Sequence, residues 1–474
     1  MNEQRLKEFE YVLSPGSIAV VGASRDETKF GTGYLRGLLT TGFKGDVYAV
    51  HPDGGKILGV DAYPSLTDIP GPVDYVIVSI PAKYIIPLLD DCAIKGVKAV
   101  QMFTAGFKES GTEEGRSLEM EITKRAKEGG FHIVGPNCIG VYNPRINMPY
   151  GMAGVIGEVG SVSVISQSGG VGGKVVKAGM LRGIHFNKVV SFGNGCDLDS
   201  VDYFEYFAQD PQTEIIGAYL EGVADGPRLF HLLRETAAIK PVVIWKGGRT
   251  PAGAATANSH TGSLAASDTV WTAMARQAGV VKVGDADELS DALLALQYIR
   301  KAPGNRLSIV AGIMGGGGGD SVSSTDTCSL LGLQVLPFSD ETRKHLVTLL
   351  PTAGSILRNP LDMGSVGANL GIMEKTLEIV ATDPCVDLII IQDPIDDLIS
   401  FLGRDLVRAI NDIFVRFSGN HSKPLIVVSP MGAPSPDQRE IEGMLSYAHI
   451  PVFPTLERAA KAIINVNQYY QHHT

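Results

Sequence analysis

The chain has 474 residues, of which 44% are hydrophobic, so its length and composition allow two to four domains with sizeable cores. Its formal net charge of −10 and its lack of a basic run argue against nucleic-acid binding. No apolar run could span a membrane, the first residues lack a signal-peptide core, and the five scattered cysteines lack CxxC spacing, so we expect a cytoplasmic protein without disulfides or bound metal.

The first third of the chain alternates short β-branched runs with helical patterns. The runs are SIAVVGAS (17–24), GDVYAVHP (45–52), VDYVIVSIP (73–81), VKAVQMFT (97–104) and FHIVGPN (131–137). Near-continuous apolar strands that alternate with helices are typical of a parallel sheet buried on both faces. We therefore expect an α/β domain over residues 1–145, with its ligand site at the carboxyl ends of the strands. That edge is expected to lie near Ser24, Pro52, Pro81, Phe103 and Asn137.

The first of these strands ends in a glycine turn that opens a helix, SIAVVGASRDETKFGTGYLRGLL (17–39). Such a turn directs backbone N–H groups and the positive helix end at an anion. A dinucleotide fits poorly, because GxGxxG spacing is absent and Asp53 is only approximately placed for a ribose. The cations Lys29 and Lys56 suit a ligand with extra phosphate. The simpler alternative is that Gly22 only makes a tight turn.

A second series of strands begins at SVSVISQSGG (161–170) and extends over residues 146–300. A buried strand ends at Ile165, and Ser-Gln-Ser-Gly-Gly opens the next helix. Two hydroxyls and free glycine N–H groups at a helix start form a cradle for one phosphate. The alternative is a helix cap with Ser168 as the N-cap residue, and the two interpretations are compatible.

The stretch NSHTGSLAASD (258–268) places one histidine, His260, among small residues. No charged residue occurs from Thr250 to Ser267. We expect a mobile loop that presents His260 at one place and withdraws it to another, although a lone histidine is most often an ordinary residue.

An imidazole can carry a phosphoryl group on one ring nitrogen if an acceptor holds the other. Glu221 ends the strand EIIGAYLEG (214–222), where a parallel sheet presents functional side chains. It could orient His260 as an aspartate orients the histidine of a catalytic triad. The alternative is an ordinary exposed acid at a strand end.

A third series follows KAPGNR (301–306) and occupies residues 303–474. Its segments repeat those of the second series in the same order. SVSVISQSGGVGG corresponds to LSIVAGIMGGGGGD, FAQDPQTEIIGAYLEG to VATDPCVDLIIIQDP, and KPVVIWKGG to KPLIVVSPMG. We therefore interpret both series as domains of one flavodoxin-like type. The third copy has no counterpart of SHTGSLA, so we expect the chemistry in the second domain.

Together these segments resemble the α-type half of the NDP-forming acyl-CoA synthetases, the superfamily of succinyl-CoA synthetase. The ADP-forming acetyl-CoA synthetase type is the more similar. The resemblance is carried by GASRDETKFG, GPNCIGVYN, SQSGG, DPQTEIIGAYLEG, KPVVIWKGGRT and SHTGSLAASD, in that order. It implies three doubly wound domains: a Rossmann-like CoA-binding domain followed by two flavodoxin-like CoA-ligase domains.

The resemblance also implies roles for individual residues. His260 becomes phosphorylated, and Glu221 steadies it. The phosphate-binding helix start comprises Ser166, Gln167, Ser168 and Gly169. Coenzyme A lies in the first domain, with the GAS turn around its phosphates and with Asn137 and Cys138 at its thiol end. The expected CoA-binding residues are Gly22, Ser24, Lys29, Pro52, Lys56, Pro81, Phe103, Asn137 and Cys138.

The implied reaction interconverts acyl-CoA, ADP and phosphate with a carboxylic acid, CoA and ATP, through an acyl phosphate and a phosphohistidine. The family binds ATP or ADP with Mg²⁺ on an ATP-grasp fold. Three α/β domains occupy this whole chain, and it contains no GxxxxGK[ST]. The resemblance therefore implies a separate ATP-grasp β subunit, in an α2β2 assembly.

Two other functions stay open on the sequence. An NAD-linked Rossmann oxidoreductase is disfavoured by the missing fingerprint, and a non-enzymatic CoA-binding regulatory protein would not need SHTGSLA. The run Gly315–Gly319 and the segment RNPLDMGSV depart from the family pattern. These departures leave open which carboxylic acid is the substrate, and we expect acetate or another short-chain acid. They do not change the expected class of reaction.

Overall fold

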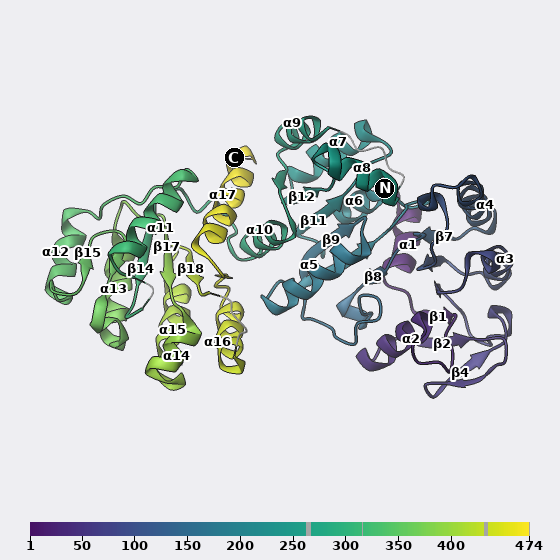
Figure 1. The fold of residues 1–474 in the computed structure, drawn as a ribbon, viewed down its shortest axis with the longest axis horizontal. Coiled ribbons are helices and arrows are strands. Elements are labelled where there is room, and N and C mark those ends of the chain that lie inside the picture. Colours follow the sequence, from purple (N-terminus) through teal and green to yellow (C-terminus); the bar gives the residue numbers. More distant parts are fainter. Residues whose placement is uncertain (262–266, 315, 431–434, 474) are drawn as a thin grey trace. The chain divides into compact units, whose positions relative to one another are not determined.

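The structure is a computed structural model that describes residues 1–261, 267–314, 316–430 and 435–473; for residues 258–261 it describes the backbone alone. The chain divides into two compact units. Unit 1 comprises Met1–Met180 and Ile184–Leu289, and unit 2 comprises Leu181–Gly183 and Ser290–Thr474. Unit 1 holds two sheets and unit 2 holds one, each with helices packed beside its strands (Figure 1). The expected α/β fold is confirmed.

The first sheet of unit 1 has the strand order β3-β4-β2-β1-β5-β6-β7. Its strands are β1 (Ser17–Val21), β2 (Asp46–Val50), β3 (Gly55–Ile57), β4 (Val60–Tyr63), β5 (Tyr75–Val78), β6 (Ala99–Met102) and β7 (His132–Val134). All neighbours pair in parallel except β3 with β4. Apart from the edge strand β3, this is the doubly wound Rossmann order, in which ligands bind where the order reverses, between β1 and β5.

The helices of this part are short and have recognisable ends. They are α1 (Glu3–Leu13), α2 (Phe30–Thr41), α3 (Ile85–Lys95) and α4 (Glu113–Gly129), with the 3-10 helices η1 (Leu66–Asp68), η2 (Ala82–Tyr84), η3 (Lys108–Ser110) and η4 (Pro144–Ile146). Asn2 and Thr112 accept hydrogen bonds from the first turns of α1 and α4. Gly42, with φ of 65°, ends α2 in the left-handed conformation that glycine favours.

The second sheet of unit 1 has the order β13-β12-β11-β9-β10-β8. Its strands are β8 (Gly140–Tyr142), β9 (Val159–Ser166), β10 (Phe186–Ser191), β11 (Ile215–Leu220), β12 (Val242–Lys246) and β13 (Val281–Val283). The helices of this segment are α5 (Gly169–Leu181), α6 (Ser200–Gln209), α7 (Gly226–Ala237), α8 (Pro251–Thr261), α9 (Asp268–Ala278) and α10 (Ala286–Tyr298). β8 pairs antiparallel with β10, so part of the segment expected in the first domain (1–145) completes the second sheet.

The sheet of unit 2 has the order β15-β16-β14-β17-β18-β19. Its strands are β14 (Leu307–Ala311), β15 (Ile356–Leu357), β16 (Leu361–Asp362), β17 (Leu388–Gln392), β18 (Leu425–Val428) and β19 (Val452–Phe453). Its helices are α11 (Gly318–Leu330), α12 (Asp340–Leu349), α13 (Leu370–Thr382), α14 (Ile395–Leu402), α15 (Arg404–Asn420), α16 (Pro436–Tyr447) and α17 (Leu456–His473), with the 3-10 helix η5 (Gly364–Ala368).

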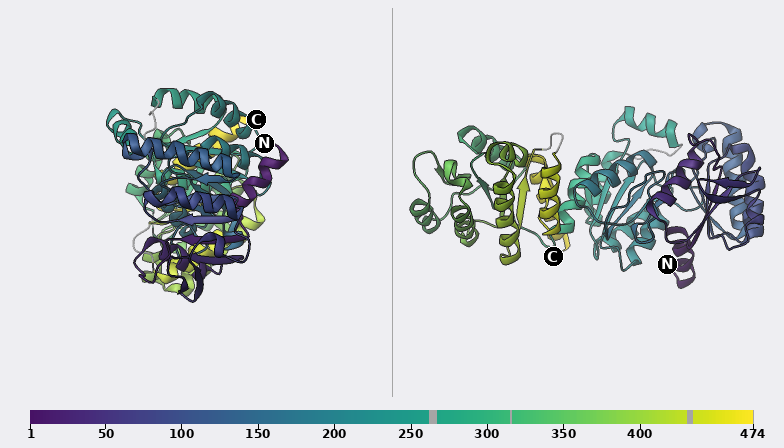
Figure 2. Two further views of the ribbon diagram at one scale, coloured as in Figure 1. Left: turned by 90° about the vertical axis from the view of Figure 1, so that its right-hand side faces the viewer. Right: turned by 90° about the horizontal axis from the view of Figure 1, so that it is seen from below.

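The second and third sheets have the same topology. In each, the five parallel strands follow the flavodoxin-like order 2-1-3-4-5, and an antiparallel strand is added at one edge. The right-hand view of Figure 2 shows strands with helices beside them in each part of the chain. The predicted pair of flavodoxin-like domains is confirmed.

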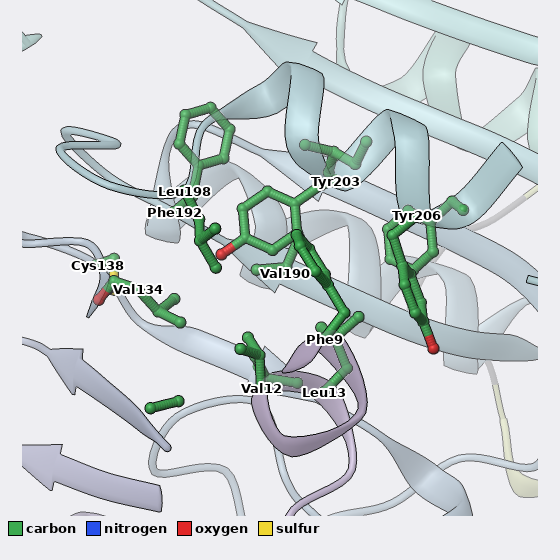
Figure 3. Packing of buried hydrophobic residues seen from close by; sticks show 14 of the residues in the cluster. Phe9, Val12, Leu13, Val134, Cys138, Val190, Phe192, Leu198, Tyr203 and Tyr206 are labelled. Carbon is green, nitrogen blue, oxygen red and sulfur yellow. Dashed lines mark hydrogen bonds between the residues drawn. The ribbon is translucent and has the colours of Figure 1, made fainter. Parts of the chain in front are cut away.

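A shared core joins the two sheets of unit 1. Phe9 of α1 is fully buried, and its ring centroid lies 5.8 Å from that of Tyr203 and 5.3 Å from that of Tyr206, both on α6. Figure 3 shows these rings near Val134 of the first sheet and Val190 of the second. Because one core contains side chains from both sheets, their edges are held together and a site can form between them.

Candidate active site

A pocket of about 640 Å³ lies between the two sheets of unit 1. The start of α2 and the segments that follow β5, β6 and β7 line one side, and the start of α5 and the segment after β10 line the other. The lining residues are Phe30, Ser79, Ile80, Pro81, Phe103, Thr104, Ala105, Asn137, Cys138, Ile139, Gln167, Ser168, Gly169, Gly170 and Gly193. None of these side chains is charged, and the pocket volume is in the usual range for small-molecule sites.

This pocket brings together candidate residues from both predicted domains. Those that line it are Pro81, Phe103, Asn137 and Cys138 from the first and Gln167, Ser168 and Gly169 from the second. Ser166 is buried and outside the lining, and its hydroxyl donates to the carbonyl oxygen of Ser168 at 2.6 Å. The remaining candidates are also outside the lining: Gly22, Ser24, Lys29, Pro52 and Lys56.

The glycine turn after β1 is tightly packed. Gly22 has φ of 98°, and a Cβ there would lie 2.4 Å from the backbone oxygen of Ser79, which follows β5. The Ser24 amide donates to the Thr32 hydroxyl at 3.0 Å, and the Ser24 hydroxyl accepts from the Asp26 amide at 3.2 Å. These bonds give the turn a defined shape at the predicted switch point between β1 and β5.

The two lysines expected beside this turn have acidic partners. The Lys29 ammonium lies 3.9 Å from the Asp26 carboxylate, and the Lys56 ammonium lies 2.8 Å from that of Asp61. The hydrogen bond to Asp61 raises the pKa of Lys56. All four side chains are solvent-exposed, so the lysines could exchange these partners for a phosphate at little cost.

Arg25 is a further cation at this turn, beyond the two lysines expected from the sequence. Its guanidinium donates to the carbonyl oxygen of Gly54 at 2.9 Å and lies 3.9 Å from the Asp53 carboxylate. It thereby connects the turn after β1 with the loop after β2, which contains the exposed Pro52. A cation directly after Gly-Ala-Ser was the signal in the sequence.

Asn137 and Cys138 lie together on the wall of the pocket. Asn137 has a left-handed backbone, with φ of 57°, which asparagine tolerates better than most residues. The Cys138 side chain is 3% exposed, and its Sγ donates to the Val134 carbonyl oxygen at 3.3 Å. Burial raises the pKa of Cys138 far above its usual value. Cys138 is therefore a packing residue of the wall and not a nucleophile.

The helix start at α5 is built around Gln167 and Ser168. The Ser168 hydroxyl accepts a long hydrogen bond of 3.4 Å from the Val171 amide, so it caps the helix. The Gln167 side-chain oxygen accepts from the amides of Glu221 and Gly222, at 2.7 Å and 3.1 Å. This links the candidate phosphate cradle to the end of β11.

Glu221 follows β11 and is 7% exposed. Its Oε1 accepts from the Tyr219 hydroxyl at 3.0 Å. Its Oε2 is buried and has no hydrogen-bond partner in the described part of the chain. A buried carboxylate oxygen is stable only with a donor, so this atom suits an N–H group from a segment that approaches the strand end.

The structure corrects the expected loop around His260. Residues Pro251–Thr261 form helix α8, because alanine is the best helix former and proline suits a first turn. The Thr250 hydroxyl accepts from the Gly253 amide at 3.1 Å and caps this helix. The His260 side chain and residues 262–266 lie outside the described residues, so its predicted contact with Glu221 stays a prediction. Helix α8 lies close to η3 of the first sheet's segment.

Among the described residues, no group of three or more His, Cys, Asp and Glu side chains could hold a metal ion. Within the same ranges, no helix is long and apolar enough to cross a membrane.

Two parts of the chain match known domain families. Residues 16–144 match the CoA binding domain family, and residues 159–296 match the succinyl-CoA ligase like flavodoxin domain family. Each matched range supplies one side of the pocket in unit 1.

Several curated relatives match nearly the whole chain, and others match most of it. This chain is 33% identical over 462 residues to ADP-forming acetate–CoA ligase II subunit alpha of Pyrococcus furiosus, and the match covers 96% of each of the two chains. It is 37% identical over 463 residues to ADP-forming acetate–CoA ligase I of Archaeoglobus fulgidus, covering 97% of this chain and 64% of that longer protein. A 4-hydroxybutyrate–CoA ligase (ADP-forming) of Nitrosopumilus maritimus is 34% identical over 80% of this chain and 54% of its own.

A solved structure from Candidatus Korarchaeum cryptofilum has a similar fold. It is described as dinucleotide forming acetyl-coenzyme A synthetase 1 in complex with phosphate and ADP. The TM-score is 0.82 at 30% sequence identity, and the match covers 98% of this chain and 97% of that one.

Proposed function

We propose that this chain, which belongs to the family of ADP-forming acyl-CoA synthetase α subunits, interconverts acyl-CoA, ADP and phosphate with a carboxylic acid, CoA and ATP. One observation carries the proposal. The pocket of unit 1 is lined both by residues of the range that matches CoA-binding domains and by a helix start suited to phosphate. A thioester bound on the first side would therefore lie beside phosphate bound on the second.

Coenzyme A would bind with its charged end at the turn after β1. The backbone around Gly22 and Ser24 and the cations Arg25, Lys29 and Lys56 suit its phosphates. Its thiol arm would enter the pocket past Pro81 and Phe103 towards Asn137 and Cys138. The uncharged lining there suits the uncharged arm.

The chemistry at the helix start takes two steps. A phosphate oxygen attacks the thioester carbonyl, the C–S bond breaks, and the CoA thiolate leaves and takes a proton; the product is an acyl phosphate. A ring nitrogen of His260 then attacks phosphorus, the P–O bond to the acyl group breaks, and the carboxylate leaves. Ser168, Gly169 and the positive end of α5 stabilise the negative charge on the transferred group.

The phosphohistidine then passes its phosphoryl group to ADP. An oxygen of the ADP β-phosphate attacks phosphorus, and the P–N bond breaks to restore the imidazole. Glu221 accepts a hydrogen bond from the N–H group of the ring during both transfers. This leaves the other ring nitrogen unprotonated and free to react. We place ADP, ATP and Mg²⁺ on an ATP-grasp β subunit, in an α2β2 assembly located in the cytoplasm. The α subunit itself then has three domains, at 1–145, 146–300 and 303–474.

Acetate is the acid with which to begin, because relatives of high coverage are named for it. Another relative is named for 4-hydroxybutyrate, so a panel of short-chain carboxylic acids belongs in the same assay.

The test is co-expression with an ATP-grasp β subunit and measurement of ATP-dependent thioester formation. We predict that His260→Ala abolishes turnover, because no other group takes the phosphoryl from the acyl phosphate. CoA binding, measured by calorimetry, should be unchanged, because the pocket is formed by other residues. In the wild-type complex, labelled ATP should leave an acid-labile, base-stable phosphate on the α chain. Turnover by the alanine variant would refute the phosphohistidine route.

A further inference from the structure

Two buried side chains of opposite charge end neighbouring strands of the second sheet. β11 and β12 pair in parallel with Leu220 opposite Lys246, so Glu221 and Lys246 emerge at the same edge. Lys246 is fully buried, and Glu221 nearly so. Burial lowers the pKa of Lys246, whereas the nearby carboxylate of Glu221 favours its charged form.

Neither charged group is fully paired within the described ranges. The Lys246 ammonium has three donors, and its hydrogen bond there is to the carbonyl oxygen of Gly247. The other charges near it, Asp268 and Lys282, pair with each other at 2.8 Å. Oε2 of Glu221 has no partner there. Because burying an incompletely paired charge costs stability, a role in packing does not explain this lysine.

The turn after β12 lies between these two charged residues and helix α8, whose last turn contains His260, and Lys246 also approaches α9. A Cβ at Gly247 would lie 2.6 Å from the Tyr219 hydroxyl, which donates to the neighbouring carboxylate. Gly248 lies against α8, since a Cβ there would be 3.3 Å from backbone and side-chain atoms of that helix. The ammonium of Lys246 lies 5.9 Å from the ring centroid of Trp271 on α9.

We propose that Lys246 is a positioning residue of the phosphoryl-transfer site and acts through Glu221. Its ammonium supplies the positive charge that a buried carboxylate requires. The carboxylate therefore keeps its orientation and accepts a hydrogen bond from the N–H group of the His260 ring. The ammonium also offsets the repulsion between that carboxylate and a phosphorylated imidazole. This inference rests on the proposed function and adds a residue to it.

The test is Lys246→Met, which keeps an unbranched side chain only one atom shorter and removes the charge. The α chain with its β subunit is incubated with labelled ATP, and the initial rate of acid-labile labelling is measured beside CoA binding and the urea midpoint. We expect the labelling rate to fall at least about tenfold with CoA binding unchanged. The urea midpoint should be unchanged or higher, because an apolar side chain replaces a buried charge. A lysine needed only for folding would instead lower the midpoint.

Two further variants isolate the role. Lys282→Met removes a lysine of the adjacent strand β13 and should leave labelling within about twofold of wild type. In a Glu221→Gln background, Lys246→Met should cause no further loss, because its effect passes through Glu221. Unchanged labelling in the single variant, or a fully additive loss in the double variant, overturns the inference. A wild-type chain that takes no label overturns the proposed function itself.

Discussion

Glu221 is the residue whose chemistry can be tested most directly, because its Oε2 is buried without a partner in the described ranges. We predict that Glu221→Gln lowers the rate of His260 phosphorylation by a factor of roughly 10² to 10⁴, since the amide offers N–H where the imidazole needs an acceptor. Single-turnover labelling measures this rate. Glu214→Gln, at the exposed position just before the same strand, is the control and should label normally. Normal labelling in both would remove Glu221 from the mechanism.

At the scale of elements, the start of α5 depends on a glycine that lets two segments approach. A Cβ at Gly169 would lie 2.3 Å from Cγ1 of Ile139, on the pocket wall. Gly169→Ala should therefore displace the helix start and raise the KM for phosphate by roughly 10- to 100-fold. The corresponding helix of the third sheet, α11, begins at Gly318, where a Cβ meets nothing within 4 Å. Gly318→Ala should leave the KM unchanged, and equal values in the two variants would contradict the role of α5.

At the scale of the whole molecule, helix α1 belongs to the core that joins the first two sheets. Phe9 is fully buried against Tyr203 and Tyr206. Phe9→Ala should lower the free energy of unfolding by about 3–5 kcal/mol, through lost burial and the cavity left behind. Urea denaturation measures this. Tyr11→Ala, at a 42% exposed position on the same helix, should change it by less than about 1 kcal/mol. A small loss in both variants would show that α1 does not stabilise the unit.

Local pattern predicted the fold well because strands, glycine turns and caps depend on neighbouring residues. The order of segments also predicted that the second and third sheets share one topology, and the strand orders confirm it. The pattern failed at residues 251–261, where the absence of bulky anchors suggested a loop. Alanine propensity and the Thr250 cap make this segment helical. The strand Gly140–Tyr142, at the end of the expected first domain, pairs with β10 of the second sheet.

The sequence by itself determined the α/β class, the duplication, the family resemblance and the identity of the chemically distinctive residues, because each is written in composition, spacing or segment order. Only the tertiary structure decided which of those residues share a pocket. It brought Asn137 and Cys138 beside Gln167 and Ser168 and gave Lys56 an acidic partner at a sheet edge. It also made Lys246 a buried charge beside Glu221. Burial and pairing across strands arise from contacts between residues distant in the chain, and no local pattern encodes them.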